Sequence, residues 1–250
     1  MNNKIYLIMG ASSDIGIAYI KSLEKQLLRD GQTAQVIAHY RAGDTALKML
    51  QNSLKAICLK LVQADLTQFD EVEQMLLCIK EEYGCPDHIL HLPASKLVYQ
   101  KLKKLEWDAV LRDMEIQVHS LAEACRTFLP LMAKQGYGKV VVMLSSATLG
   151  MPPKFMSQYV IVKYALLGLM KSMAMEYAEK GININGISPN MVETKFLEQI
   201  DDRIIEINRD NCTLKRNVEI EEVLPAIHFL MSEGSDYMNG VNLNLTGGDR

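Results

Sequence analysis

The sequence of 250 residues has little of what marks secreted, membrane or metal-binding proteins. No apolar run approaches the roughly 20 residues of a membrane-spanning helix, and the first residues show no signal-peptide pattern. The five cysteines are odd in number, scattered and never spaced Cys-x-x-Cys, which argues against a disulfide framework or a zinc site. These absences predict a cytoplasmic protein that has no membrane contact and no metal.

Strong charge of one sign is also missing. The net charge of −3 and the pI near 6.0 give no electrostatic footprint for a nucleic acid or an anionic membrane. The five histidines have no metal-ligand spacing, so we expect structural or surface roles for them. Only His91 would lie near a ligand, because it ends a predicted strand.

Strand-like and helix-like segments alternate along the chain without a linker or repeat. This alternation predicts one Rossmann-type α/β domain over residues 1–250, with a seven-stranded parallel sheet covered on both faces by helices. We expect ligands at the carboxyl ends of the strands. The predicted strands are 4–9, 35–40, 56–62, 88–92, 139–144, 182–187 and 241–245, and the predicted helices are 15–30, 44–53, 68–83, 105–134, 157–180 and 219–232.

Ser146, Tyr159 and Lys163 form the most informative pattern. A Tyr phenol has a pKa of about 10, and a nearby ammonium would lower it by roughly 1–3 units. Tyr159 and Lys163 are four residues apart and would share one helix face. Ser146 follows a predicted strand and would polarise the carbonyl that Tyr159 protonates. A second Tyr-x-x-x-Lys, beginning at Tyr99, lacks the upstream serine and is interpreted as accidental.

A glycine turn lies between the first predicted strand and helix. The stretch Gly10-Ala-Ser-Ser-Asp-Ile-Gly16 would point backbone N–H groups and a helix N-terminus at a pyrophosphate. An ordinary βα turn is the alternative interpretation of this segment taken alone.

Together these motifs resemble the short-chain dehydrogenase/reductase family, most closely its 3-oxoacyl-[acyl-carrier-protein] reductase branch. The likeness spans nearly the whole chain and includes the segment from Ile187 to Thr194 and the tail that ends at Gly248. It implies catalysis by Ser146, Tyr159 and Lys163, with Gln117 in place of a relay asparagine. It implies a cofactor site of Gly10, Ser12, Ser13, Ile15, Gly16, Tyr40, Arg41, Asp65, Leu66, Ala94, Tyr159, Lys163, Pro189 and Thr194.

The chain departs from the family pattern at three places. Asp14 occupies the middle glycine position, where its charge should point away from the phosphates. His91-Leu-Pro-Ala94-Ser95 replaces Asn-Asn-Ala-Gly and leaves only small residues near the ribose. Gln117 has the amide group of asparagine on a longer side chain. A proton relay through it would either persist by way of a water molecule or be altered.

The leading functional hypothesis is an NADPH-dependent reductase that converts a carbonyl to an alcohol. Tyr40 stands where an acid would bind the ribose 2′-hydroxyl, and Arg41 follows it, which favours NADP(H). The alternative is a sensor or scaffold protein that binds the dinucleotide but no longer catalyses a reaction. Enoyl reduction is less favoured, because relatives that perform it carry Tyr seven residues before Lys and this position is Met156.

Residues 191–217 are predicted to form a substrate lid. Apolar residues at helix-like spacing suggest a 3-oxoacyl thioester or another carbonyl compound with an apolar tail, unless this face simply packs on the protein body. Five cations in the same segment would attract an acidic carrier or a CoA phosphate. The apolar residues are Met191, Val192, Phe196, Leu197, Ile200, Ile204 and Ile205, and the cations are Lys195, Arg203, Arg209, Lys215 and Arg216.

The predicted helix 157–180 is apolar nearly all round, so the sheet can cover only part of it. The predicted helix 105–134 adds Leu121, Ala124, Cys125, Phe128 and Leu129. Relatives pair these two helices across a two-fold axis. We therefore expect a homo-oligomer, specifically a tetramer.

Overall fold

A single parallel sheet organises the computed structural model, which describes residues 3–198 and 200–248. Its seven strands run in the order β3-β2-β1-β4-β5-β6-β7, so the predicted Rossmann-type fold is confirmed. All neighbouring strands pair in parallel. The strands are β1 (Lys4–Met9), β2 (Ala34–Tyr40), β3 (Ile57–Gln63), β4 (His88–His91), β5 (Gly138–Met143), β6 (Ile182–Pro189) and β7 (Asn242–Leu245).

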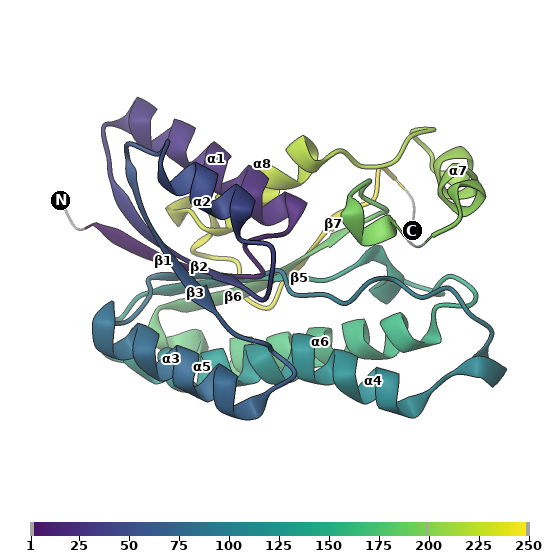
Figure 1. Cartoon of the computed structure of the whole chain (residues 1–250), viewed down its shortest axis with the longest axis horizontal. Helices are drawn as coiled ribbons and strands as arrows, with labels where there is room; N and C mark the ends of the chain where they lie inside the picture. The colour runs from purple at the N-terminus through teal and green to yellow at the C-terminus, as the bar shows by residue number, and fades with distance from the viewer. Residues whose placement is uncertain (1–2, 199, 249–250) are drawn as a thin grey trace.

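Helices cover the sheet on both faces (Figure 1). A separate apolar core fills each side. One face is covered by α1 (Asp14–Asp30), α2 (Thr45–Gln51) and α8 (Ile220–Leu230). The other is covered by α3 (Phe69–Glu82), α4 (Trp107–Met114), α5 (Ser120–Gln135) and α6 (Ser157–Glu176). Helix α7 (Asp202–Asn211) lies apart from both layers. Both faces of the central strands are buried, which explains their continuous apolar runs.

The strand order reverses beside β1, which pairs with β2 on one side and with β4 on the other. At such a switch point the connections leave in opposite directions and open a crevice outside the carboxyl ends. Met9, at the end of β1, pairs with His91, at the end of β4. The turns that follow these two strands therefore face each other.

The helix predicted over 105–134 is two helices joined by a π-helical turn, Glu115–His119. The Ser120 hydroxyl donates a hydrogen bond of 2.6 Å to the carbonyl of Ile116, one turn back. Turns of this kind occur frequently at functional sites. Gln117 is in this turn, which periodicity alone does not reveal.

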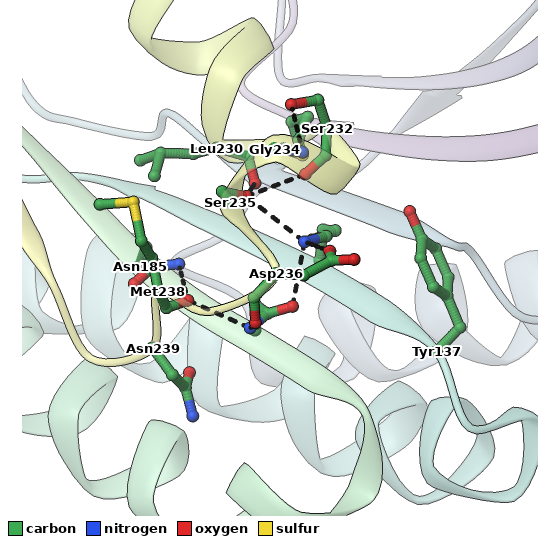
Figure 2. Close-up of polar contacts among 12 residues, drawn as sticks. Tyr137, Asn185, Leu230, Ser232, Gly234, Ser235, Asp236, Met238 and Asn239 are labelled. Carbon is green, nitrogen blue, oxygen red and sulfur yellow. Dashed lines mark hydrogen bonds and ion pairs between the residues drawn. The ribbon is translucent and has the colours of Figure 1, made fainter.

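The amino ends of the strands are tied to the C-terminal segment by buried Lys139. Its ammonium donates to Asn183 Oδ1 at 3.0 Å, to Ser235 Oγ at 3.3 Å and to the Asp236 carboxylate. Figure 2 shows the hydrogen bonds that converge on Ser235 and Asp236. Three acceptors match the three N–H donors of an ammonium, so this buried charge is well compensated. This network fixes the approach to β7.

The helices in the described part of the chain are all too short or too polar to cross a membrane.

Candidate active site

A cavity of about 1090 Å³ opens at the carboxyl ends of the strands and extends under the predicted lid. It brings together most of the site residues predicted from sequence, whereas Gly16, Tyr40 and Gln117 are not among its lining residues in the described chain. The predicted residues that line it are Gly10, Ser12, Ser13, Ile15, Arg41, Asp65, Leu66, Ala94, Ser146, Tyr159, Lys163, Pro189 and Thr194.

The glycine turn after β1 has a conformation that requires its two glycines. Gly10 has φ of +73°, and a Cβ there would lie 3.1 Å from the Pro93 nitrogen. A Cβ at Gly16 would lie 2.5 Å from the Ala11 carbonyl oxygen, so Gly16 permits close packing of α1 on the turn. Ser13 caps α1 by accepting a 3.1 Å hydrogen bond from the Gly16 N–H. The N-terminus of α1 thus faces the cavity.

His39, near the end of β2, holds this turn in place. Its Nδ1 accepts a 3.1 Å hydrogen bond from the Gly10 N–H, and its Nε2 lies 3.1 Å from the Ala64 carbonyl. These partners require the neutral tautomer with the proton on Nε2. Burial lowers the pKa of His39 and favours that neutral form. We expected only a structural or surface role for it, since the sequence does not reveal its partners.

Tyr159, on α6, lines the cavity and is half-buried. Burial raises its pKa to about 12, and a hydrogen bond to the Ser145 side chain acts in the opposite direction. Tyr159 therefore carries its proton at neutral pH and is ready to act as an acid. The expected lowering of this pKa by Lys163 is not observed.

The position of Lys163 explains this correction. Its Nζ lies 5.7 Å from the centre of the Tyr159 ring and donates a 2.8 Å hydrogen bond to the Met143 carbonyl at the end of β5. Burial lowers the Lys163 pKa to about 7, and the charge of Asp113 opposes that shift. An amine that is partly neutral near pH 7 stabilises a phenolate less than a full ammonium does.

Asp113 was not predicted from the sequence. This carboxylate on α4 is buried and accepts a 2.7 Å hydrogen bond from Gln158 Nε2. Gln158 precedes Tyr159 on α6, so the pair joins α4 and α6 beside Tyr159. Nothing in the local sequence marks Asp113, because its importance comes from its place beside Lys163.

Two consecutive serines line the cavity after β5, Ser145 and Ser146. Ser145 caps the 3-10 turn Ser146–Thr148 by accepting a 3.1 Å hydrogen bond from the Ala147 N–H. The Ser145 side chain is also the hydrogen-bond partner of Tyr159. The 13-residue spacing in the sequence indicated Ser146, which also lines the cavity, and its catalytic role stays a prediction.

Gln117 and His91 lie behind the site. Gln117 is buried, and its Oε1 has no hydrogen-bond partner among the described residues. The His91 Nε2 lies 3.1 Å from Ser120 Oγ. Burial and the charge of Lys163 lower the His91 pKa to about 3, so this imidazole is neutral. A relay role for Gln117 stays a prediction.

Arg41 and Asp65 lie at the far end of the cavity. The Asp65 carboxylate accepts hydrogen bonds from the Thr67 N–H at 2.9 Å and from Thr67 Oγ1 at 2.8 Å. The Thr67 N–H lowers the Asp65 pKa most, and the charge of Arg41 contributes. A positive and a negative side chain thus lie together where β2 and β3 end.

The lid segment packs apolar side chains against Tyr159. Leu197 and Ile200 are buried in a small cluster with Leu97 and Met156, and Tyr159 packs against this cluster. The Phe196 ring centre lies 6.0 Å from that of Tyr159. Helix α7 adds Ile204 and Ile207 to the cavity lining. Part of the lid therefore packs on the protein body and part lines the site.

Across residues 3–198 and 200–248, no three His, Cys, Asp or Glu side chains are grouped so that they could hold a metal ion.

A doubly wound sheet with a glycine turn and a Tyr-Lys pair in one cavity is typical of dinucleotide-dependent oxidoreductases. A family model described as Enoyl-(Acyl carrier protein) reductase matches residues 10–249. The chain therefore belongs to this family of short-chain dehydrogenases/reductases, as the sequence motifs predicted.

Individual relatives are similar over nearly their full length. The chain is 26% identical to the acetoacetyl-CoA reductase of Allochromatium vinosum, with 98% of each chain covered. It is 25% identical to a 3-oxoacyl-[acyl-carrier-protein] reductase of Staphylococcus epidermidis, again with 98% of each covered. A solved gluconate 5-dehydrogenase of Burkholderia cenocepacia, in complex with NADP and tartrate, superimposes with a TM-score of 0.86 at 20% identity, covering 99% of this chain and 95% of the other. This last likeness shows the fold alone.

Proposed function

We propose that the protein is an NADPH-dependent reductase that converts a ketone with an apolar tail to a secondary alcohol. The observation that carries the proposal is the hydrogen-bonded pair of Ser145 and Tyr159, which shares one cavity with the glycine turn and Lys163.

The side chains account for the proton chemistry of such a reduction. Tyr159 donates its phenolic proton to the carbonyl oxygen, and the Ser145 hydroxyl donates to the phenol oxygen and so stabilises the developing phenolate. Lys163 supplies positive charge beside the phenolate, which the buried carboxylate of Asp113 helps it to retain. When bound, a nicotinamide cofactor would supply the hydride for the carbonyl carbon, and the proton from Tyr159 would complete the alcohol.

The glycine turn fits the pyrophosphate of a dinucleotide. A Cβ at Gly10 would crowd Pro93, and Ser12, Ser13 and Ile15 line the cavity around the N-terminus of α1. Backbone N–H groups at a helix N-terminus bind phosphate oxygens. Asp65 and Leu66 would hold the adenine end, and Ala94, Pro189 and Thr194 the nicotinamide end.

Arg41 supports NADPH as the cofactor, because its guanidinium lines the cavity where β2 ends and would pair with a 2′-phosphate. We expect Arg41→Ala to lower kcat/KM for NADPH by about 10–100-fold, the effect of losing one or two hydrogen bonds to a charged group. The value for NADH should change by less than about threefold, since NADH lacks that phosphate. Steady-state kinetics with both cofactors measure these changes in kcat/KM. Arg29→Ala, which removes an exposed arginine of α1, is the control. An unchanged NADPH preference would contradict the assignment.

The lid supports a substrate with an apolar tail. Phe196, Ile204 and Ile207 face the cavity beside Tyr159, whereas a sugar would require more fixed polar partners there. Arg209 and Arg216 of the same segment pair with Asp210 and Glu222, so their attraction for an acidic carrier is reduced. We favour a 3-oxoacyl thioester.

A panel of carbonyl substrates with NADPH tests the proposal. We expect kcat/KM for acetoacetyl and longer 3-oxoacyl thioesters to exceed that for small polar ketones or sugars by at least about tenfold, the effect of a few buried methylenes. Equal or faster reduction of the polar compounds would refute the substrate class but not the reductase. Cofactor binding without oxidation by any substrate would instead favour the sensor or scaffold.

Ketone reduction is favoured over enoyl reduction within this family. Met156 occupies the position seven residues before Lys163, and it is buried under the lid. Its thioether cannot donate a proton. Within residues 156–163 the only phenol is that of Tyr159, four residues before Lys163.

We propose that the enzyme is a homo-oligomer, specifically a tetramer. The apolar residues of α5 named in the sequence analysis are buried in the chain's own core, so they do not supply a second face. Helix α6 does, since Ile161 is 37%, Tyr164 43% and Met175 82% exposed. We expect a tetrameric mass by light scattering at micromolar concentration, and a monomeric mass would contradict the proposal.

The five free thiols suit a reducing, cytoplasmic location.

A further inference from the structure

Asp14 links the glycine turn to the lid. It is the first residue of α1, but its carboxylate does not cap its own helix, because Ser13 has that role. Instead, Asp14 Oδ2 accepts a 2.8 Å hydrogen bond from the backbone N–H of Lys195, which is 181 residues away in the sequence. Lys195 begins the 3-10 turn Lys195–Leu197 in the lid.

This hydrogen bond crosses the cofactor end of the cavity. Asp14 lines the cavity from the protein body, and Thr194 and Lys195 line it from the lid. The lid also makes apolar contacts with the body, where Leu197 joins the cluster beside Tyr159. A second polar contact, the exposed ion pair between Lys96 and Glu198 at 3.2 Å, joins the lid to the segment after β4.

The charge of Asp14 lies where an anionic ligand would bind. The N-terminus of α1 attracts negative charge through its dipole and its unpaired N–H groups. The Asp14 carboxylate already occupies the first turn, so it would repel a pyrophosphate held by the adjacent N–H groups. Its hydrogen bond to Lys195 keeps the carboxylate directed at the lid.

We propose that Asp14 is an affinity-determining and positioning residue that couples cofactor exchange to the lid. Its charge lowers the affinity of the glycine turn for the pyrophosphate, and its hydrogen bond links the lid to that turn. Opening of the lid therefore frees the carboxylate at the same end of the cavity where the cofactor enters and leaves. This inference rests on the proposed function for the identity of the anion, but not for the contact between Asp14 and Lys195.

Three variants separate the charge from the hydrogen bond. Asp14→Asn removes the charge and keeps an oxygen acceptor, whereas Asp14→Ala removes both and stays compatible with a helix. Glu198→Ala breaks the ion pair with Lys96, removes a carboxylate that does not line the cavity, and is the matched control. Two quantities are measured for each full-length variant: the dissociation constant of NADPH, by fluorescence titration at low and moderate salt, and the rate at which trypsin cleaves the lid without cofactor.

We expect both Asp14 variants to bind NADPH about 3–10-fold more tightly at low salt, the effect of removing one like charge near a protein surface. The gain should shrink as salt screens the charge. Trypsin should cleave the lid of Asp14→Ala at least about threefold faster than that of the wild type, because local opening exposes the chain. Asp14→Asn should be cleaved like the wild type, and Glu198→Ala should leave NADPH affinity unchanged.

NADPH affinities within twofold of the wild type in both Asp14 variants would overturn the role of the charge. Equal cleavage of Asp14→Ala, Asp14→Asn and wild type would overturn the role of the hydrogen bond. If the wild type binds neither NADPH nor NADH, the proposed function fails instead. The cleavage comparison still decides the contact in that case, because it needs neither cofactor nor turnover. Thermal denaturation by circular dichroism identifies any variant that has lost its fold.

Discussion

Replacement of Tyr159 by Phe is expected to lower kcat by about 10²–10⁴-fold, the usual contribution of a general acid. The change removes one hydroxyl and keeps the ring that packs near Phe196 and the lid cluster. Because the pKa of Tyr159 is raised to about 12 by burial, this phenol is protonated at neutral pH and is the proposed proton donor. Initial rates with a 3-oxoacyl thioester and NADPH measure the loss.

The binding of NADPH should change little in the same variant, since the cofactor contacts assigned to the glycine turn and Arg41 remain. Fluorescence titration should give a dissociation constant within about threefold of the wild-type value, because only one neutral hydrogen bond is lost. Tyr237→Phe, at a fully exposed position outside α6, is the control and should retain full activity. A Tyr159→Phe enzyme with more than about a tenth of wild-type kcat would exclude the acid role.

Ser145→Ala is expected to lower kcat by about 10²-fold, comparable with the loss of one oxyanion-stabilising donor. Ser145 is the hydrogen-bond partner of Tyr159, so its removal leaves the developing phenolate without that donor. Ser146→Ala is the natural comparison, because Ser146 lines the same cavity. We expect a smaller loss there, because Ser145 is the serine whose hydrogen bond lowers the pKa of Tyr159.

A larger loss of kcat in Ser146→Ala than in Ser145→Ala would favour Ser146, the serine that the sequence spacing predicted. A large loss in both variants would show that the turn needs both hydroxyls, since Ser145 also accepts the Ala147 N–H at 3.1 Å. Thermal unfolding distinguishes that case, because loss of a cap lowers stability by about 0.5–2 kcal/mol. A Ser145→Thr enzyme, which keeps the hydroxyl, should retain more activity than Ser145→Ala.

Local patterns in the sequence were sufficient for the fold and for much of the site. Apolar runs alternating with amphipathic segments predict a parallel sheet, because period and length are local properties. Tyr159 and Lys163 share one face of α6 as their spacing predicted, since helix geometry depends only on neighbouring residues. The glycine turn was recognisable for the same reason. Its two glycines meet backbone atoms of Ala11 and Pro93, which any side chain at these positions would crowd.

Tertiary structure alone decided the electrostatics of the site. Burial, not the nearby lysine, sets the pKa of Tyr159, and the buried carboxylate of Asp113 acts on Lys163 from another helix. These effects depend on distance through the folded protein and on the exclusion of water, and neither has a signature in the spacing of residues. The choice between Ser145 and Ser146 depends in the same way on how the chain turns after β5.

Contacts between distant segments were equally beyond sequence reasoning. His39, on β2, accepts from the Gly10 N–H at the end of the neighbouring strand β1. Asp14 accepts from the Lys195 N–H, 181 residues away in the sequence. In both cases one partner is a backbone group, which every residue except proline carries, so residue identity gives no sign of the pairing. The sequence by itself determined which chemical groups the protein has and on which elements they lie. The packing of those elements decided which groups meet, how deeply they are buried and therefore what charge they carry.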